Sequence, residues 1–311
     1  MTKNQKPIAV VTGANTGLGL QTSIGLAKAG YTVVLACRNE NKAQAAMDKI
    51  QRKQASATLD FIPLDLIDRN TIQRFGETFS ERYDHLDLLI NNAGVMSPPY
   101  TITPNALELQ FDANHIGHFY LTSLLLSKLD QEFETRIVNV SSLAAKRDWA
   151  DINFDNLNFE GLYNEGPKLF GLSGMQAYSQ SKLANVLFTI ELANRLANAG
   201  KNIKAVIAHP GVSATDLGRH MPVYLRLLAP ILAPMLGMSK PAEGAESILY
   251  AALDSGVKSG DFIGPSGKGE RRGPPGLVPL PPKASDEDSD EELRRKLWAL
   301  SEEKLGVAFA L

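Results

Sequence analysis

The sequence predicts an α/β fold: one doubly wound parallel sheet with helices on both faces, in a single domain over residues 1–311. Two patterns support this expectation. Short apolar runs rich in β-branched residues alternate with helix-periodic segments along most of the chain, and a glycine-rich turn follows the first of these runs. Strands that alternate with helices are typical of a parallel sheet covered on both sides.

Composition limits the classes of function. The chain has 32 basic and 34 acidic residues, a formal net charge of −2, so its charge does not favour nucleic acid as a partner. Its single cysteine, Cys37, excludes an internal disulfide, and no cluster of ligands indicates a metal site. Residues 1–7 are short and polar, unlike a signal peptide, so we expect a cytoplasmic protein.

The first strand is expected at residues 8–12, with a helix behind the glycine-rich turn and a second strand at 31–36. Glycines let a backbone approach a pyrophosphate, and the first turn of the helix offers unpaired N–H groups to it. A plain tight turn is the alternative. We expect the dinucleotide contacts of this turn to come from Gly13, Asn15, Thr16, Gly17, Leu18 and Gly19.

The end of the second strand selects the dinucleotide. Arg38 and Asn39 stand where an acidic residue would bind the ribose 2′-hydroxyl of NAD. The Arg38 guanidinium can instead bind the 2′-phosphate of NADP, so NADP(H) is the expected cofactor. The alternative is that Arg38 simply starts the next helix, 41–54.

Two further strand ends offer polar or small residues to the cofactor. Strand 58–64 is followed by Asp65 and Leu66. Asp65 could hold the adenine amino group, or it could cap the helix expected at 69–83. The crevice beyond the strand ends of such a sheet binds ligands. After strand 86–90, Asn91, Ala93 and Gly94 are therefore expected at this ligand crevice.

Residues 104–129 predict a long, mostly apolar helix that contains Asn114, His115 and His118. The two histidines lack a carboxylate or a third ligand beside them, which argues against a metal site. Asn114 could bond to the backbone at an irregularity of the helix. The polar residues within an apolar segment are therefore open to either a functional or a structural explanation.

The strand expected at 136–140 ends in Ser141 and Ser142. A serine hydroxyl at a strand end can bond to a substrate oxygen, and an ordinary loop serine is the alternative. No Gly-x-Ser-x-Gly elbow surrounds either residue, which disfavours a serine hydrolase.

Tyr178 and Lys182 lie four residues apart in a helix expected at 175–195, so they share a face. An ammonium beside a phenol favours the phenolate, so we expect Lys182 to lower the Tyr178 pKa from about 10. Such a phenol can exchange a proton with an alcohol or carbonyl oxygen. The alternative is an exposed pair on the surface of the helix.

An insertion, residues 146–175, precedes this helix. A strand at 203–208 is followed by Pro210, Gly211, Val212 and Thr215. Residues 213–240 contain an apolar stretch, 221–238, that is too short and too interrupted by prolines for a transmembrane helix. It predicts either a lid over a lipophilic substrate or a peripheral contact with a membrane surface.

The last part of the chain predicts a helix at 242–253 and a short final strand at 261–263, which closes a core of residues 7–263. The C-terminal extension, 264–311, is expected to contain an irregular surface segment, 264–282, and a short amphipathic helix, 293–305.

The ordered set of motifs resembles the short-chain dehydrogenase/reductase family, which has a Rossmann fold. The set comprises Thr12-Gly13-x-x-x-Gly17-x-Gly19, Asn91-Asn92-Ala93-Gly94, Asn114, Ser142, Tyr178-x-x-x-Lys182 and Pro210-Gly211. The run from Asn114 to Phe119 and the run from Ser181 to Asn185 are most similar to the retinol dehydrogenase-like branch, which includes protochlorophyllide reductase relatives.

The resemblance implies a role for each matching residue. Tyr178 is the general acid/base, Lys182 tunes it and binds the nicotinamide ribose, and Ser142 orients the substrate oxygen. Asn114 holds a water for proton relay, and Gly13, Gly17 and Gly19 cradle the pyrophosphate. Asp65 meets the adenine, 91–94 line the cofactor and 210–215 contact the nicotinamide side. Thr16 stands where some NADP-dependent members have a basic residue, so Arg38 alone supports NADP.

We therefore expect an NADP(H)-dependent oxidoreductase that transfers hydride between the nicotinamide and a carbonyl or alcohol carbon of a lipophilic substrate. A reductase of carbon–carbon double bonds and a non-catalytic NADP-binding protein remain alternatives. Either a monomer or a homodimer agrees with the sequence.

Overall fold

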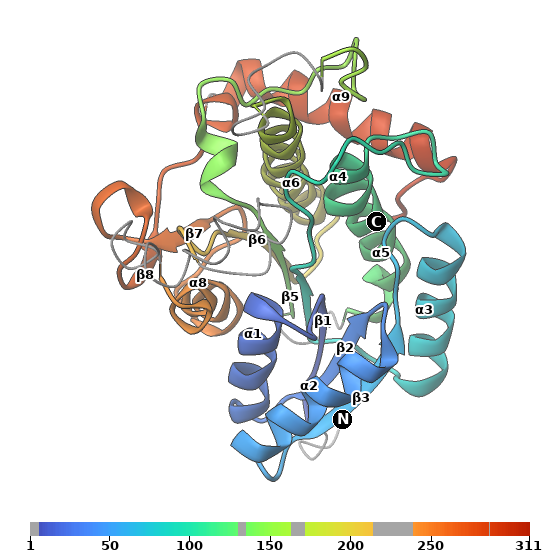
Figure 1. Cartoon of the computed structure of the whole chain (residues 1–311), viewed down its shortest axis with the longest axis vertical. Coiled ribbons are helices and arrows are strands. Elements are labelled where there is room, and N and C mark those ends of the chain that lie inside the picture. The colour runs from blue at the N-terminus through green and yellow to red at the C-terminus, as the bar shows by residue number, and fades with distance from the viewer. Residues whose placement is uncertain (1–5, 130–134, 163–171, 214–238, 286) are drawn as a thin grey trace.

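A computed structural model describes residues 6–129, 135–162, 172–213, 239–285 and 287–311 of the chain. These residues form one eight-stranded sheet, in the order β3-β2-β1-β4-β5-β6-β7-β8 (Figure 1). The predicted doubly wound α/β fold is confirmed. The strands are β1 Ile8–Thr12, β2 Thr32–Cys37, β3 Thr58–Pro63, β4 Leu88–Asn91, β5 Thr135–Val140, β6 Ile203–Ala208, β7 Phe262–Pro265 and β8 Pro275–Leu277.

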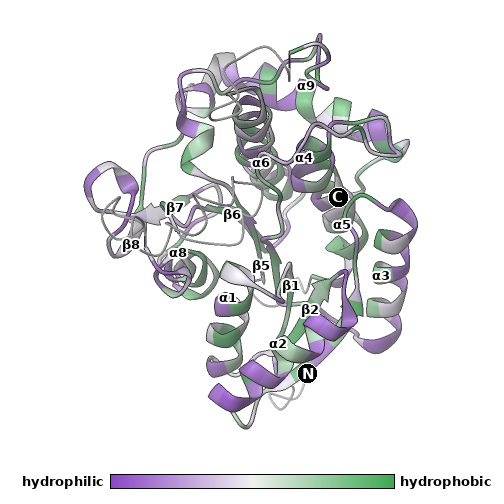
Figure 2. Cartoon of the chain, in the orientation of Figure 1, coloured by the Kyte–Doolittle hydropathy of each residue, from purple (hydrophilic) through white to green (hydrophobic). Residues whose placement is uncertain are grey.

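Two layers of helices cover the sheet. On one face α1, α2 and α8 pack against the strands, and on the other α3, α5 and α6 do so (Figure 1). The strands are hydrophobic and the outer helix faces hydrophilic (Figure 2), as burial on both faces of a parallel sheet requires. The helices are α1 Gly17–Lys28, α2 Glu40–Lys53, α3 Arg69–Arg82, α4 Leu109–Phe111, α5 Gly117–Leu125, α6 Leu172–Asn198, α8 Pro241–Leu253 and α9 Glu287–Leu305.

The chain winds outward from β1 in two directions, because β1 pairs in parallel with both β2 and β4. Strand order therefore reverses between β1 and β4, and the crevice at such a reversal is the usual ligand site of an open α/β sheet. The glycine-rich turn after β1 and residues 91–94 after β4 meet at this point.

The helix expected at 104–129 is wrong as a continuous α-helix. Instead α4 passes into a π-helix, Asp112–Ile116, followed by α5 and a 3₁₀ turn, Leu126–Lys128. A π-helical turn inserts a residue into the ladder and re-aims the side chains beside it, which periodicity alone does not reveal. Asn114 lies in the middle of this turn.

Residues 264–282 also differ from the expected irregular surface segment. The strand predicted at 261–263 is not the last one, because β8 lies beyond it and pairs antiparallel with β7, with Ile263 opposite Leu277. Short 3₁₀ turns, Lys268–Glu270 and Pro282–Ala284, flank β8. The extension thus adds an edge to the sheet.

The terminal helix α9 packs across α6, and the chain end returns to the core with it (Figure 1). Trp298 and Phe309 are buried against Phe119 of α5 and Phe188 of α6. The Trp298 and Phe309 rings lie 4.8 Å apart between centroids, and Phe309 lies 5.1 Å from Phe119. Aromatic rings in this arrangement add to the stability gained from burying their area.

Replacing Phe309 with Ala tests this anchor. We expect Phe309→Ala to lower the free energy of unfolding by about 3 kcal/mol, because it empties a buried ring site. The exposed Val307 provides the matched control, and Val307→Ala should stay within about 0.5 kcal/mol of the wild type. Urea denaturation measures both; equal midpoints for the two variants would mean that the chain end does not stabilise the fold.

Candidate active site

Tyr178 and Lys182 lie on one buried face of α6, with only 4% of each exposed. The Lys182 ammonium nitrogen lies 5.9 Å from the centre of the Tyr178 ring. The alternative of an exposed surface pair is therefore wrong. Both groups face the carboxyl end of β5, which carries the two serines.

The Ser142 hydroxyl lies near enough to the Tyr178 phenol to favour the phenolate and lower the Tyr178 pKa. Ser142 follows β5 as the cap of the 3₁₀ turn Leu143–Lys146, and its oxygen accepts from the Ala144 N–H at 3.2 Å. Its own O–H can therefore be directed to the phenol. Ser141 is occupied elsewhere, because its hydroxyl donates to the Lys182 carbonyl at 2.8 Å. Of the two serines, the structure thus brings Ser142 to the tyrosine.

The Tyr178 pKa moves in the direction opposite to the expected one. Burial raises this pKa to about 12, and the nearby Ser142 hydroxyl opposes the rise. The expectation that Lys182 lowers the Tyr178 pKa is wrong for this geometry, because the cost of burying the phenolate dominates. The Lys182 ammonium itself donates to the Val140 carbonyl, 2.9 Å away. A buried phenolate loses its hydration, and this cost exceeds the help from the serine.

Gly94 makes room for Lys182 and Asn114. A Cβ at Gly94 would lie 3.5 Å from the Lys182 ammonium nitrogen and 3.2 Å from the Asn114 side-chain oxygen. A side chain at this position would touch the ammonium and press on the Asn114 oxygen. The predicted role of Gly94 as a small residue beside the cofactor crevice thus has a second reason, which is the close approach of α6 and the π-helix.

The Asn114 side chain holds the loop after β4 against α6. Its oxygen accepts from the Val95 N–H at 2.8 Å, and its amide donates to the Val95 carbonyl at 3.0 Å and to the Ser181 hydroxyl at 2.9 Å. Both amide protons are used by these bonds, and the partner at Val95 is backbone, so the structural explanation of Asn114 at a helix irregularity is confirmed. Its peptide oxygen accepts from His118 Nδ1 at 2.9 Å.

His118 connects the π-helix to the glycine-rich turn, a link that sequence reasoning missed. Because Nδ1 donates to Asn114, Nε2 accepts from the Thr12 hydroxyl at 2.9 Å. The Thr12 oxygen in turn accepts from the N–H groups of Asn92 and Ala93, both at 2.9 Å. Burial lowers the His118 pKa to about 4, so the ring is neutral at physiological pH. A threonine at the end of β1 was the available signal.

His115 has a separate structural partner. Its Nε2 lies 2.9 Å from the Ser301 oxygen on α9, and that serine donates its own proton to the Leu297 carbonyl. Nε2 is therefore the donor. Within the described ranges, no group of three His, Cys, Asp or Glu residues is placed to hold a metal ion.

The glycine-rich turn has the conformation that its composition predicts. Gly13 and Gly17 have positive φ angles of 64° and 54°. A Cβ at Gly19 would lie 2.3 Å from the Gly13 carbonyl oxygen, so only glycine fits there. Asn15 is half-buried, Thr16 is exposed and Leu18 is buried at the start of α1. The N-terminus of α1 thus opens towards the crevice with its N–H groups unclaimed by a side-chain cap.

Arg38 and Asp65 face each other at the ends of β2 and β3. The guanidinium lies 3.9 Å from the Asp65 carboxylate, and the Arg38 side chain is 62% exposed. Asp65 does not cap α3, because Asp68 does. Arg38 does not start α2, because Asn39 caps that helix. The Asn39 side chain is thereby engaged with the Lys42 N–H at 2.9 Å.

Two other predicted cofactor residues have side chains directed into the protein. The Asn91 amide donates to Thr122 at 2.9 Å and to Asn139 at 2.7 Å, between the sheet and α5. Leu66 is buried, and a Cβ at Gly117 would lie 2.3 Å from its carbonyl oxygen. Contacts from these two residues to a cofactor would have to come from the main chain.

The loop after β6 places Pro210, Gly211 and Val212 beside residues of the extension. The Val212 N–H donates to the Arg271 carbonyl at 2.9 Å. The sequence analysis did not predict that the extension contacts this loop, because the glycine and proline content of 264–282 indicated only an irregular surface segment. Thr215 and most of the expected lid, 214–238, lie outside the described residues, as does 163–171 of the insertion.

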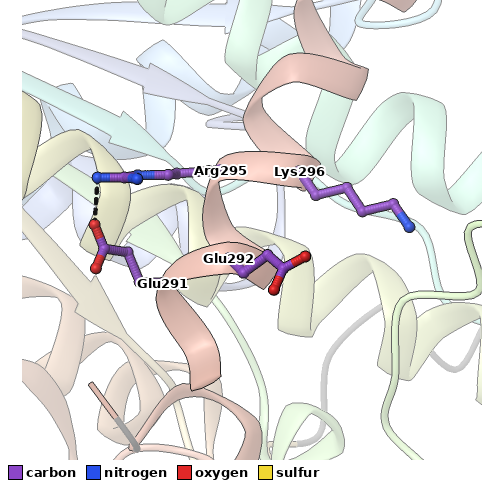
Figure 3. A pocket seen from close by; sticks show the side chains of 4 residues that line it. All are labelled: Glu291, Glu292, Arg295 and Lys296. Atoms are coloured by element: carbon purple, nitrogen blue, oxygen red, sulfur yellow. Dashed lines mark ion pairs between the residues drawn. The ribbon is translucent and has the colours of Figure 1, made fainter. Parts of the chain in front are cut away.

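A surface hollow on α9 is lined by Glu291, Glu292, Arg295 and Lys296 (Figure 3). Glu291 and Arg295 form an ion pair along the helix. None of the predicted site residues lines this hollow, and four exposed charges of both signs offer no catalytic arrangement.

Comparisons with known proteins agree with this geometry. A sequence model of the family described as short chain dehydrogenase matches residues 7–153. Retinol dehydrogenase 14 of Mus musculus is 38% identical over 96% of this chain and 85% of its own length. Retinol dehydrogenase 13 of Homo sapiens is 38% identical over 96% of this chain and 84% of its own.

Solved structures show the same fold. An uncharacterized protein from Mycobacterium paratuberculosis has a TM-score of 0.76 and 35% identity, covering 98% of this chain and 95% of that one. A variant of actinorhodin polyketide ketoreductase with NADPH has a TM-score of 0.63 at 23% identity, covering 84% and 96%, which supports the fold alone. The chain belongs to the short-chain dehydrogenase/reductase family of oxidoreductases. Within that family it falls in the retinol dehydrogenase-like branch.

The described helices include none that is both long enough and apolar enough to cross a membrane.

The buried ammonium of Lys182 predicts a pH-dependent stability. Burial lowers its pKa from 10.5 to about 8, so between these values the unfolded chain binds more protons than the folded one. The stability contributed at this position therefore rises with pH. We expect wild type to gain about 3 kcal/mol of unfolding free energy over Lys182→Met between about pH 7 and pH 10.5.

Urea denaturation across this pH range measures the effect. Lys49→Met, at an exposed lysine of α2, is the control, and its difference from wild type should not change with pH. A constant difference for Lys182→Met as well would contradict the burial of a charged group at position 182.

Proposed function

We propose that this protein is an NADP(H)-dependent oxidoreductase that transfers hydride between the nicotinamide and a carbonyl or alcohol carbon of a lipophilic substrate. One observation carries the proposal: a buried tyrosine on α6 has the Ser142 hydroxyl near its phenol and lies beside a buried lysine, Lys182. A sensor of the dinucleotide would need the glycine-rich turn but not this proton machinery.

Tyr178 moves the proton. With its pKa near 12 the phenol is protonated at neutral pH, which is the form that donates to a carbonyl oxygen. This protonation state supports reduction of a carbonyl. Ser142 directs its hydroxyl to the same space, where it orients the substrate oxygen and stabilises charge that develops on it.

Lys182 and Asn114 serve the proton relay. Val95 and Ser181 accept both amide protons of the Asn114 side chain, so we assign the relay water to its peptide oxygen. His118 takes one lone pair of that oxygen and leaves the other. Lys182 lies close enough to bind the nicotinamide ribose and to pass a proton towards this water.

The cofactor would lie across the reversal between β1 and β4. When bound, its nicotinamide supplies or accepts the hydride. Residues 13–19 would hold the pyrophosphate, and Arg38, exposed at the end of β2, would pair with the 2′-phosphate. Asp65, beside Arg38, would meet the adenine. The loop 210–212 and Thr215 would contact the nicotinamide.

The relatives named retinol dehydrogenase support a lipophilic alcohol or the matching carbonyl compound as substrate. We place the protein in the cytoplasm, because a single cysteine is typical of a reducing compartment. Residues 221–238 form either a lid or a membrane contact in this proposal. A monomer is favoured over a homodimer through α6, because α9 already covers that helix.

A panel of carbonyl compounds tests the function. We expect the wild type to oxidise NADPH with lipophilic aldehydes or ketones, and Tyr178→Phe to lower kcat at least about 100-fold, because it removes the general acid. NADPH should still bind to the variant. Tyr250→Phe, at a half-buried tyrosine of α8, is the matched control and should keep full activity.

Turnover by Tyr178→Phe at the wild-type rate would exclude the mechanism. An absence of turnover by the wild type with every compound would favour the dinucleotide-binding protein without catalysis.

Cofactor choice is tested at Arg38. We expect Arg38→Asp to reduce kcat/KM for NADPH relative to NADH by about ten- to a hundredfold, because a charge-assisted contact becomes a repulsion. Arg52→Asp makes the same charge change at an exposed arginine in the last turn of α2 and should leave the ratio unchanged. Steady-state kinetics with both cofactors measures the ratio; an unaltered ratio in Arg38→Asp would remove this residue from the assignment.

A further inference from the structure

A carboxylate from the C-terminal extension joins two loops at the candidate active site. Glu270, in the 3₁₀ turn after β7, accepts from the Lys146 ammonium at 2.8 and 2.6 Å through its two oxygens. One of these oxygens also accepts from His209 Nε2 at 2.9 Å. Lys146 ends the turn that begins behind Ser142, and His209 begins the loop that contains 210–212.

The bond to Glu270 fixes the state of His209. The ring is fully buried, and a carboxylate oxygen can only accept, so Nε2 carries the hydrogen. Nδ1 is then free to accept, and it does so from the Gly211 N–H at 3.2 Å. Burial lowers the His209 pKa to about 4, so the imidazole is neutral. Its Nε2 donates to Glu270 and its Nδ1 accepts from Gly211. The carboxylate thus acts through the ring on the backbone of the next loop.

The backbone of the extension also packs closely against the loop 210–212. Gly211 has a φ of +68°, and a Cβ there would lie 2.3 Å from the Arg271 carbonyl oxygen. This oxygen accepts from the Val212 N–H. On the other side, a Cβ at Gly264 would lie 2.0 Å from His209 Nε2. No side chain could stand between the extension and this loop, so a shift of one moves the other.

The contact of Glu270 with Lys146 connects it to the turn that Ser142 caps. The Lys146 ammonium lies over the Phe262 ring, 4.8 Å from its centre, and its side chain is only 15% exposed. The turn that it ends is capped by Ser142, whose hydroxyl lies near the Tyr178 phenol. Glu270 therefore holds the start of the nicotinamide-side loop and the end of the serine turn at one distance from each other.

The backbone at Glu270 supports a functional reason for this placement. Glu270 has a φ of +53°, in the left-handed region that side chains other than glycine rarely adopt. Such strain persists when surrounding contacts hold the residue, and it is concentrated at functional sites. The Glu270 side chain is 21% exposed, so its ion pair is better shielded than an exposed surface pair.

We propose that Glu270 is a positioning residue for hydride transfer: through Lys146 and His209 it sets the serine turn against the loop 210–212, which the proposed function places at the nicotinamide. The inference rests on that function for its catalytic consequence and on the described contacts for its structural one. Ser142 and the nicotinamide must be aligned for the reaction, and small misplacements of reacting groups cost large factors in rate.

The test compares Glu270→Ala and Glu270→Gln with Asp151→Asn. Asp151 pairs with Lys283, a more exposed ion pair that also joins the extension to the insertion, so its loss is the matched control. We expect Glu270→Ala to lower kcat per NADPH-binding site about ten- to a hundredfold, with little change in KM for the carbonyl substrate. Glu270→Gln keeps one acceptor oxygen and should retain an intermediate kcat. Asp151→Asn should match the wild type.

Hydrogen–deuterium exchange gives a readout that does not depend on turnover. The amides of Gly211 and Val212 should lose protection in Glu270→Ala and keep it in Asp151→Asn. Unchanged protection overturns the inference, whatever the activity. A wild-type value of kcat per binding site in Glu270→Ala also overturns the inference. An equal loss of kcat in Glu270→Gln and Glu270→Ala overturns it too. A wild type that never oxidises NADPH would instead refute the proposed function. The exchange result would still test whether Glu270 holds the loop 210–212 in place.

Discussion

The ammonium group of Lys182 is buried between α6 and the end of β5, and a buried charge needs close partners. The Val140 carbonyl provides one at 2.9 Å, and the rest of the site is arranged around this contact. Gly94 leaves room for the ammonium, Ser141 ties the Lys182 carbonyl to the strand end, and Tyr178 stands one helical turn away. Burial raises the Tyr178 pKa to about 12, so the phenol keeps its proton at neutral pH.

Strand ends, the π-helix and α6 are joined by a continuous set of hydrogen bonds. Thr12 collects two backbone N–H groups from the loop after β4, His118 links Thr12 to the Asn114 carbonyl, and the Asn114 amide reaches Ser181 beside Lys182. Every group in this path has its partner, as buried polar networks require if they are to be rigid. The glycine-rich turn and the segment around Lys182 are therefore connected through neutral hydrogen-bonded groups.

The C-terminal extension, 264–311, packs over α5 and α6 and also contacts loops of the candidate active site. Its helix α9 closes an aromatic cluster over α5 and α6 and meets the π-helix through the bond from His115 to Ser301. Its earlier part adds β8 to the sheet and brings Glu270 to two loops of the site. Both parts thus contact the elements that carry the candidate active site.

The sequence by itself determined the alternation of strands and helices, the glycine-rich turn and the shared helical face of Tyr178 and Lys182, because periodicity and glycine conformation are local properties. Tertiary structure alone decided which serine meets the tyrosine, that Asn114 spends its amide on Val95 and Ser181, and that burial raises the Tyr178 pKa. It also decided that residues 264–282 return to the sheet and that Glu270 meets His209. These outcomes depend on contacts between segments far apart in the chain and on exclusion of water, and neither is encoded in local spacing.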